Sequence, residues 1–173
     1  NRDGLVIGEG ACTLVLEEYE HAKARGANIL AEIVGFATNS DGVHVTQPTQ
    51  ETMAVTIRAA VEDANIDVAQ IGYVNAHGTA TDRGDVAESN ATEKALRSNV
   101  PISSLKSYLG HTLGACGAIE SWAAINMMNN GINNFRVMKK VLAKAFTGFM
   151  AFVFSVYSWR RRVFLHCVVF AIE

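Results

Sequence analysis

Two histidines of this chain lie in turns of small residues rather than on helical patterns. His77 stands in residues 75–81 (NAHGTAT) and His111 in residues 105–120 (LKSYLGHTLGACGAIE). Small neighbours let a substrate approach the imidazole closely, and a neutral imidazole can donate an Nε2 hydrogen bond to an oxygen that gains negative charge. Lys106 places a cation five residues before His111. The pattern indicates a site that stabilises an oxyanion.

Two threonines, Thr79 and Thr81, follow His77 at alternate positions, and their hydroxyls could bind a polar arm of a ligand. Each feature alone also has a structural explanation, because a histidine in a turn often serves as a hydrogen-bonding partner and a lysine usually stays solvated. When two histidines and a lysine occur together in such turns, an active site explains them about as well as separate structural roles do. On the residues alone, both interpretations stay open.

These turns fall at the boundaries between predicted strands and helices. Apolar, β-branched runs predict strands at residues 11–16, 29–38, 71–76 and 102–104. The spacing of apolar residues predicts helices at 51–64 and 82–97, and composition predicts helices at 17–25 and 114–129. The helix at 82–97 is expected to turn four apolar residues inward, Val86, Ala87, Ala91 and Leu96. The alternation favours an α/β fold class, a sheet covered by helices with sites at strand ends.

Composition limits the function classes. Of 173 residues, 49% are hydrophobic, enough for one domain with a core, and the net charge of −2 gives no positive field for nucleic acid. Cys12, Cys116 and Cys167 show neither CxxC nor metal-ligand spacing, so we expect no metal site, reduced thiols and a cytoplasmic location. Because residue 1 is not Met, we expect the sequence to begin inside a longer protein.

The segments NAHGTATDRGD and SLKSYLGHTLGACGAIE resemble the HGT and K…GH…GA segments of β-ketoacyl-acyl carrier protein synthases. The upstream residues 1–42 are also similar to that family, to synthases of fatty acid and related polyene pathways, and the resemblance covers residues 1–132. It implies a thiolase-like fold of two similar layered halves, usually dimeric. Residues 1–132 would be an incomplete C-terminal half, and residues 133–173 a divergent apolar tail.

The resemblance also implies a reaction and its residues. In the family, an acyl group is held on a cysteine, malonyl-carrier protein loses CO2, and the resulting carbanion attacks the acyl thioester. The histidines matching His77 and His111 hydrogen-bond the malonyl thioester oxygen. The lysine matching Lys106 organises this site electrostatically, and the glutamate matching Glu120 is its expected partner, although an ordinary solvated helix carboxylate is the alternative for Glu120.

Thr79 and Thr81 match the threonines that hydrogen-bond the phosphopantetheine arm of the carrier protein. The arm is a substrate carrier, and no permanently bound cofactor is expected. Expected partners are the acyl carrier protein and either an N-terminal synthase half or a second copy of the chain. Asp85 and Glu88, on the helix after the HGT turn, are interpreted as structural.

The chain departs from the family pattern in two ways. None of its cysteines matches the nucleophile, which lies in the family's N-terminal half, so Cys12, Cys116 and Cys167 are interpreted as small buried hydrophobes. After residue 132 the Gly-rich FGFGG turn is missing, and Met138-Lys139-Lys140 followed by the apolar run at 141–159 resembles a new start or a shifted reading frame. A membrane anchor through this run is an alternative that we do not favour.

Two hypotheses follow. In the first, the chain is a transferase half that supplies His77, His111 and Lys106 for decarboxylative condensation and is inactive without a cysteine-bearing half. In the second, it is a non-catalytic partner, or a truncated or frameshifted gene product, that packs against an intact synthase.

Overall fold

The computed structural model describes residues 4–42, 47–97, 99–129, 149–152, 157–159 and 162–171. The helices of this part are α1 (Tyr19–Ala24), α2 (Gln50–Asp63), α3 (Asp82–Leu96), α4 (Lys106–Leu109) and α5 (Cys116–Asn129). Its strands are β1 (Glu32–Asn39), β2 (Ile71–Asn75), β3 (Ile102–Ser103), β4 (Phe149–Phe152), β5 (Tyr157–Trp159) and β6 (Arg162–Ala171). Short 3-10 turns, η1 (Val68–Gln70) and η2 (Leu113–Ala115), precede β2 and α5.

The strands form a mixed sheet in the spatial order β1-β6-β4-β2-β3, and β5 pairs with β6 off this path. β2 is parallel to β3 and to β4, whereas β6 is antiparallel to β1 and to β4. Val74 of β2 lies opposite both Ile102 of β3 and Ala151 of β4, so β2 is an interior strand. α3 lies between β2 and β3 in sequence and makes the crossover that a parallel pair requires.

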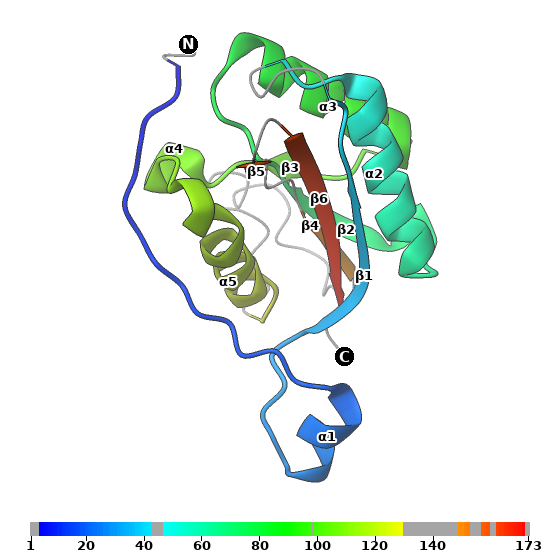
Figure 1. Cartoon of the computed structure of the whole chain (residues 1–173). Coiled ribbons are helices and arrows are strands. Elements are labelled where there is room, and N and C mark those ends of the chain that lie inside the picture. The colour runs from blue at the N-terminus through cyan, green and yellow to red at the C-terminus, as the bar shows by residue number, and fades with distance from the viewer. Residues whose placement is uncertain are drawn as a thin grey trace.

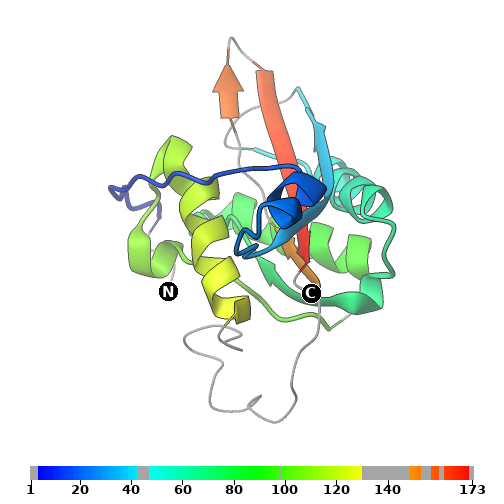
Figure 2. The same ribbon diagram turned by 90° about the horizontal axis from the view of Figure 1, so that it is seen from below.

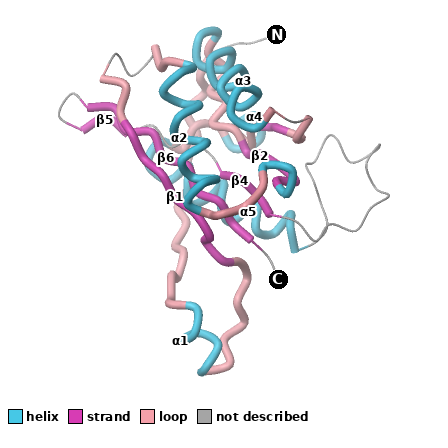
Figure 3. The backbone as a smooth tube through the Cα atoms, turned by 90° about the vertical axis from the view of Figure 1, so that its right-hand side faces the viewer, coloured by secondary structure: helices cyan, strands magenta, loops and turns pink. Residues whose placement is uncertain are grey.

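Helices cover both faces of the sheet. α2 and α3 pack together on one face, and α5 lies on the other (Figures 1 and 2). α1 lies away from the sheet, where the extended N-terminal segment turns back toward β1, as the side view shows (Figure 3). This arrangement confirms the predicted class, a mixed sheet covered by helices.

The core follows from the apolar periodicity of α2. Met53, Ile57 and Val61 recur every four residues, and each is at most 5% exposed. They form one cluster with Ile71 and Tyr73 of β2 and with apolar residues of α3 and α5. Burial of one such aliphatic side chain contributes about 1.5–3 kcal/mol to the free energy of folding. The cluster therefore fixes β2, the strand that leads into the first histidine turn.

The predicted strand at 11–16 is wrong. These residues run as extended chain outside the sheet, and Val15 and Leu16 are 86% and 73% exposed. An apolar, β-branched run becomes a strand only beside another strand, and the described part of the chain shows no strand pairing here. The inward placement of Val86 is also wrong, because it is 49% exposed, while Ala91 and Leu96 are buried as predicted.

Strands β4, β5 and β6 come from the segment interpreted as a divergent tail. β4 pairs with β2, and β6 pairs with β1 and β4. The boundary predicted after residue 132 lies outside the described residues, so the division into 1–132 and 133–173 stays a prediction. No helix among the residues that the structure describes has the length and apolar character to cross a membrane.

Gly35 of β1 provides a test of how closely the sheet packs on α2. A Cβ at this position would lie 2.4 Å from the backbone oxygen of Ala60 and 2.6 Å from the Cβ of Ala64. Gly35→Ala must therefore push β1 away from α2, and we expect it to lower the free energy of unfolding by about 1–3 kcal/mol, measured by urea denaturation. Gly114→Ala is the control, because nothing lies within 4 Å of its added Cβ. Equal denaturation midpoints for the two variants would contradict this packing.

Candidate functional site

The first histidine stands where the chain leaves β2. The strand is buried along most of its length, and His77 opens the turn that leads into α3. Gly78 adopts a φ of +48°, and a Cβ there would lie 2.5 Å from the Cβ of Ser104. Both the left-handed conformation and the close approach require glycine. The glycine thus lets the turn bend sharply against the residues that follow β3.

Glu88 and Ser104 hold this turn from two sides. The carboxylate of Glu88, on α3, accepts hydrogen bonds from the backbone N–H groups of His77 and Gly78, at 2.7 and 2.9 Å. The hydroxyl of Ser104 donates to the carbonyl oxygens of the same two residues, at 3.1 and 3.2 Å, and accepts from the backbone N–H of Lys106. The N–H and carbonyl groups of His77 and Gly78 are therefore all paired, and Ser104 ties this turn to the start of the second.

Glu88 is expected from the sequence to be structural, whereas no sequence pattern singles out Ser104. The structural interpretation of Glu88 is confirmed, and its contacts show that it shapes the site. A signal was present in the sequence, because Glu88 precedes the buried Ala91 and Ala95 by three and seven residues and therefore shares their inward face. Burial raises the pKa of Glu88 to about 7, while its two backbone donors and Lys106 oppose the shift.

The second histidine is held by backbone hydrogen bonds to the N-terminal segment. α4 ends at Leu109 with Gly110 as its C-cap, and the N–H of His111 donates to the carbonyl of Val6 at 2.7 Å. The N–H of Gly8 donates to the carbonyl of His111 at 3.1 Å. A Cβ at Gly8 would lie 2.0 Å from the carbonyl oxygen of Leu109, so only glycine allows this contact. This role of the N-terminal segment was not visible in the sequence.

The two imidazoles lie next to each other. The ring centroids of His77 and His111 are 5.0 Å apart, with an interplanar angle of 89°. The backbone N–H of Leu113 donates to Nδ1 of His111 at 3.1 Å, which leaves Nε2 as the nitrogen that carries the proton of the neutral ring. The structure thus brings the two rings together, and their catalytic roles stay predictions.

Burial and nearby charge keep both rings neutral. Burial lowers the pKa of His77 to about 3, with further lowering from the charges of Lys106 and His111. Burial, and then Lys106, also lower the pKa of His111. A neutral imidazole retains one N–H donor and one acceptor nitrogen. At pH 7 the site therefore holds two neutral hydrogen-bond donors.

Lys106 and Glu120 form a buried ion pair. The ammonium lies within hydrogen-bonding distance of Oε1, and the side chains are 6% and 4% exposed. Burial raises the pKa of Glu120, and Lys106 opposes that shift. The expected partnership is confirmed, and the solvated-carboxylate alternative is wrong. A buried pair of this kind is weak evidence for stability, but it places a cation whose field reaches both imidazoles.

Thr79 and Thr81 lie in the same turn as His77, directly before α3. Their hydroxyl oxygens are 3.0 Å apart, and both residues are partly buried. Thr81 stands at the N-cap of α3 without a side-chain capping bond, so its hydroxyl is not given to the helix. The pair is therefore placed as two hydroxyls beside the first histidine, and the predicted contact with a carrier arm stays a prediction.

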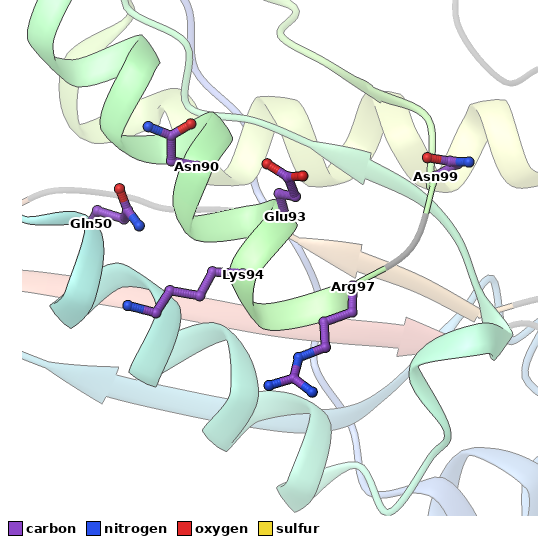
Figure 4. A pocket seen from close by; sticks show the side chains of 6 residues that line it. All are labelled: Gln50, Asn90, Glu93, Lys94, Arg97 and Asn99. Carbon is purple, nitrogen blue, oxygen red and sulfur yellow. The ribbon is translucent and has the colours of Figure 1, made fainter.

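An open pocket of about 850 Å³ lies in another part of the molecule, at the start of α2 and the C-terminal end of α3 (Figure 4). It is lined by polar side chains, namely Gln50, Asn90, Glu93, Lys94, Arg97 and Asn99. None of these residues belongs to the two histidine turns. We therefore do not assign this pocket to the chemistry of the imidazoles.

Glu88→Gln tests the buried carboxyl through the pH dependence of stability. Because the pKa of Glu88 is raised from 4.5 to about 7 on folding, its contribution to stability is fully present below about pH 4.5 and is lost as the pH rises through 7. Glu88→Gln cannot titrate, so the wild type should lose stability relative to this variant between these pH values, measured by urea unfolding. Glu93→Gln, an exposed glutamate of the same helix, should follow the wild type. A wild-type profile parallel to that of Glu88→Gln would contradict the raised pKa.

Comparisons with known proteins agree with these residues. Residues 30–145 match the family model described as "Beta-ketoacyl synthase, C-terminal domain". A 3-oxoacyl-[acyl-carrier-protein] synthase 2 of Vibrio harveyi is 52% identical over 126 residues, which are 69% of this chain and 30% of that protein. The chain thus spans less than a third of that relative's length.

Solved structures give the same result. A beta-ketoacyl synthase from Burkholderia phymatum is 46% identical with a TM-score of 0.73, and the match covers 91% of this chain and 41% of that one. A type II PKS acyl-carrier protein in complex with its ketosynthase matches at 30% identity and a TM-score of 0.70, over 91% of this chain and 42% of that one. The predicted thiolase-like fold of a ketosynthase is confirmed. The chain belongs to the β-ketoacyl synthase family and corresponds to its C-terminal domain.

Proposed function

We propose that this chain supplies the decarboxylating half of a β-ketoacyl-[acyl-carrier-protein] synthase, an acyltransferase that lengthens acyl chains in fatty acid or polyene-type biosynthesis. The observation that carries the proposal is the pair of neutral imidazoles, 5.0 Å apart. Two donors at that spacing suit one thioester oxygen held between them. The buried Lys106–Glu120 pair beside them adds a fixed charge to the same site.

His77 and His111 act on the malonyl thioester. When the bond between the α-carbon and the carboxylate breaks, CO2 leaves and the electron pair moves through the α-carbon onto the thioester oxygen. The two N–H donors stabilise this oxygen as its negative charge grows, and because they are already in place they pay no reorganisation cost. The depressed pKa values keep both rings in the neutral form, so that neither gives up a proton to the enolate.

The second half-reaction needs a nucleophile from elsewhere. The enolate carbon attacks an acyl thioester on a cysteine, the new carbon–carbon bond forms, and the cysteine leaves as a thiolate. We assign that cysteine to an N-terminal synthase half, because the chain spans only 30% of a 52% identical relative. Exposed apolar residues along the extended N-terminal segment support a missing neighbour, among them Val6 at 66% and Val15 at 86%.

The substrate arrives on a carrier protein. The hydroxyls of Thr79 and Thr81 beside the first histidine suit the amide-rich phosphopantetheine arm, and a ketosynthase with a similar fold has been solved with its acyl-carrier protein. We therefore propose an acyl carrier protein as partner and its arm as substrate carrier, with no resident cofactor. Cys12 and Cys116 are free thiols, which fits a cytoplasmic setting.

A mixing assay tests the function. The chain is combined with a cysteine-bearing N-terminal half, and both CO2 release from malonyl-carrier protein and β-ketoacyl product are measured. We expect activity in the mixture and at least about a 100-fold loss in His77→Ala or His111→Ala, since removing one oxyanion donor costs 10²–10³ in rate. His21→Ala, an exposed histidine of α1, should keep full activity. Binding between the halves without activity in any mixture would favour the non-catalytic alternative and overturn the proposal.

The pH profile tests the role of Lys106. Its charge lowers the pKa of both imidazoles, so removing the charge should raise both values and move the acid limb of the decarboxylation rate to higher pH, by about one unit. Lys106→Met alone would leave Glu120 buried and unpaired, and Glu120→Gln alone would leave the ammonium unpaired, so the comparison is Lys106→Met/Glu120→Gln against the wild type. Acid limbs that coincide in the two proteins would refute an electrostatic role for the lysine.

A further inference from the structure

Cys116 makes a contact that the proposed mechanism does not use. It is the first residue of α5 and is 2% exposed, so its burial agrees with the small-hydrophobe interpretation. Its Sγ, however, lies 3.0 Å from Nδ1 of His111, and the hydroxyl of Thr112 lies 3.5 Å from the same sulfur. The thiol is thus placed between a hydroxyl and one of the two site imidazoles.

The direction of these hydrogen bonds follows from the neighbouring backbone. The N–H of Leu113 donates to Nδ1 of His111 at 3.1 Å, and a backbone N–H can only donate. Nδ1 therefore carries no proton, and in the contact with Cys116 the thiol must be the donor. The sulfur in turn accepts from the hydroxyl of Thr112. The two hydrogen bonds therefore run in one direction. The hydroxyl of Thr112 donates to the sulfur of Cys116, and the thiol donates to Nδ1 of His111.

We propose that Cys116 is a positioning residue for His111, whose thiol joins the Leu113 N–H in holding the imidazole proton on Nε2. Two donors at Nδ1 oppose protonation of that nitrogen. They also oppose a 180° turn of the ring, which would bring a carbon to face both donors. The consequence for catalysis rests on the proposed function, because Nε2–H is then the donor held ready for the thioester oxygen. The tautomer itself does not depend on that function.

The pKa of His111 also depends on surroundings that the test must leave in place. Burial lowers this pKa most, the charge of Lys106 lowers it further, and the neutral ring of His77 lies 5.0 Å away. Substitution at Cys116 removes neither group. A change in the titration of His111 in such a variant can therefore be traced to the thiol.

The test is a ¹⁵N NMR titration of the imidazole nitrogens in the full chain, with His111 assigned through His111→Gln. In the wild type we expect Nδ1 to be unprotonated and Nε2 protonated at pH 7. Cys116→Ala should raise the pKa of His111 by about half a unit to one unit, the equivalent of one modest hydrogen bond. Cys116→Ser keeps a donor and should restore a titration close to that of the wild type. Cys12→Ala is the control for loss of a thiol elsewhere and should change nothing.

Two results would overturn the inference. One is a wild-type His111 with Nδ1 protonated at pH 7, and the other is a titration of Cys116→Ala that coincides with that of the wild type. The readout needs no turnover, so it separates this inference from the proposed function. An inactive mixture with the expected titrations would leave the thiol contact supported and refute the synthase role, while an active mixture with unchanged titrations would do the opposite.

Discussion

The site depends on keeping two imidazoles neutral beside a buried ammonium. A charged ring next to Lys106 would meet both a desolvation cost and a like charge, and these two effects lower the pKa of His77 to about 3. Neutrality leaves each ring with a hydrogen-bond donor and no net charge, which suits an oxygen whose charge appears only during the reaction. The carboxylate of Glu120 compensates the charge of the Lys106 ammonium, so the cation can stay buried while both imidazoles stay neutral.

The fold supplies this arrangement through turns rather than through long elements. β2 ends at a turn whose N–H groups are taken by Glu88 and whose carbonyls are taken by Ser104. The second turn is held by backbone hydrogen bonds between His111 and residues 6–8. Each histidine is therefore held through its own main chain, His77 and its neighbour by two side chains and His111 by the backbone of residues 6–8. A small shift in any of these segments changes the spacing of the rings.

Much of this could be predicted from the sequence. The helices α2 and α3 are predicted by the spacing of their apolar residues, and α5 and β2 by their apolar composition, because these apolar residues are buried against each other within this chain. The motif residues His77, His111, Lys106 and Glu120 were identified from their turns and from the family resemblance, and the structure brings them together in two contacts.

The wrong strand and the contacts that were not predicted have a common physical cause, because each depends on which segments lie side by side in the fold. The run at 11–16 carries a strand pattern, but a pattern fixes no strand where no partner backbone lies beside it, and Val15 stays 86% exposed. Ser104 carried no periodic signal, because its role comes from one close approach to Gly78. The contact of Cys116 with His111 depends on the geometry of the turn before α5, which residue types alone do not specify.

A structure of the chain, joined with its cysteine-bearing half and bound to a non-reactive malonyl-thioester analogue, would locate the thioester oxygen relative to the two rings. We predict that this oxygen lies within about 3.2 Å of Nε2 of both His77 and His111, the range of an ordinary hydrogen bond. A thioester oxygen bound by neither ring, or rings that separate when the analogue binds, would contradict it.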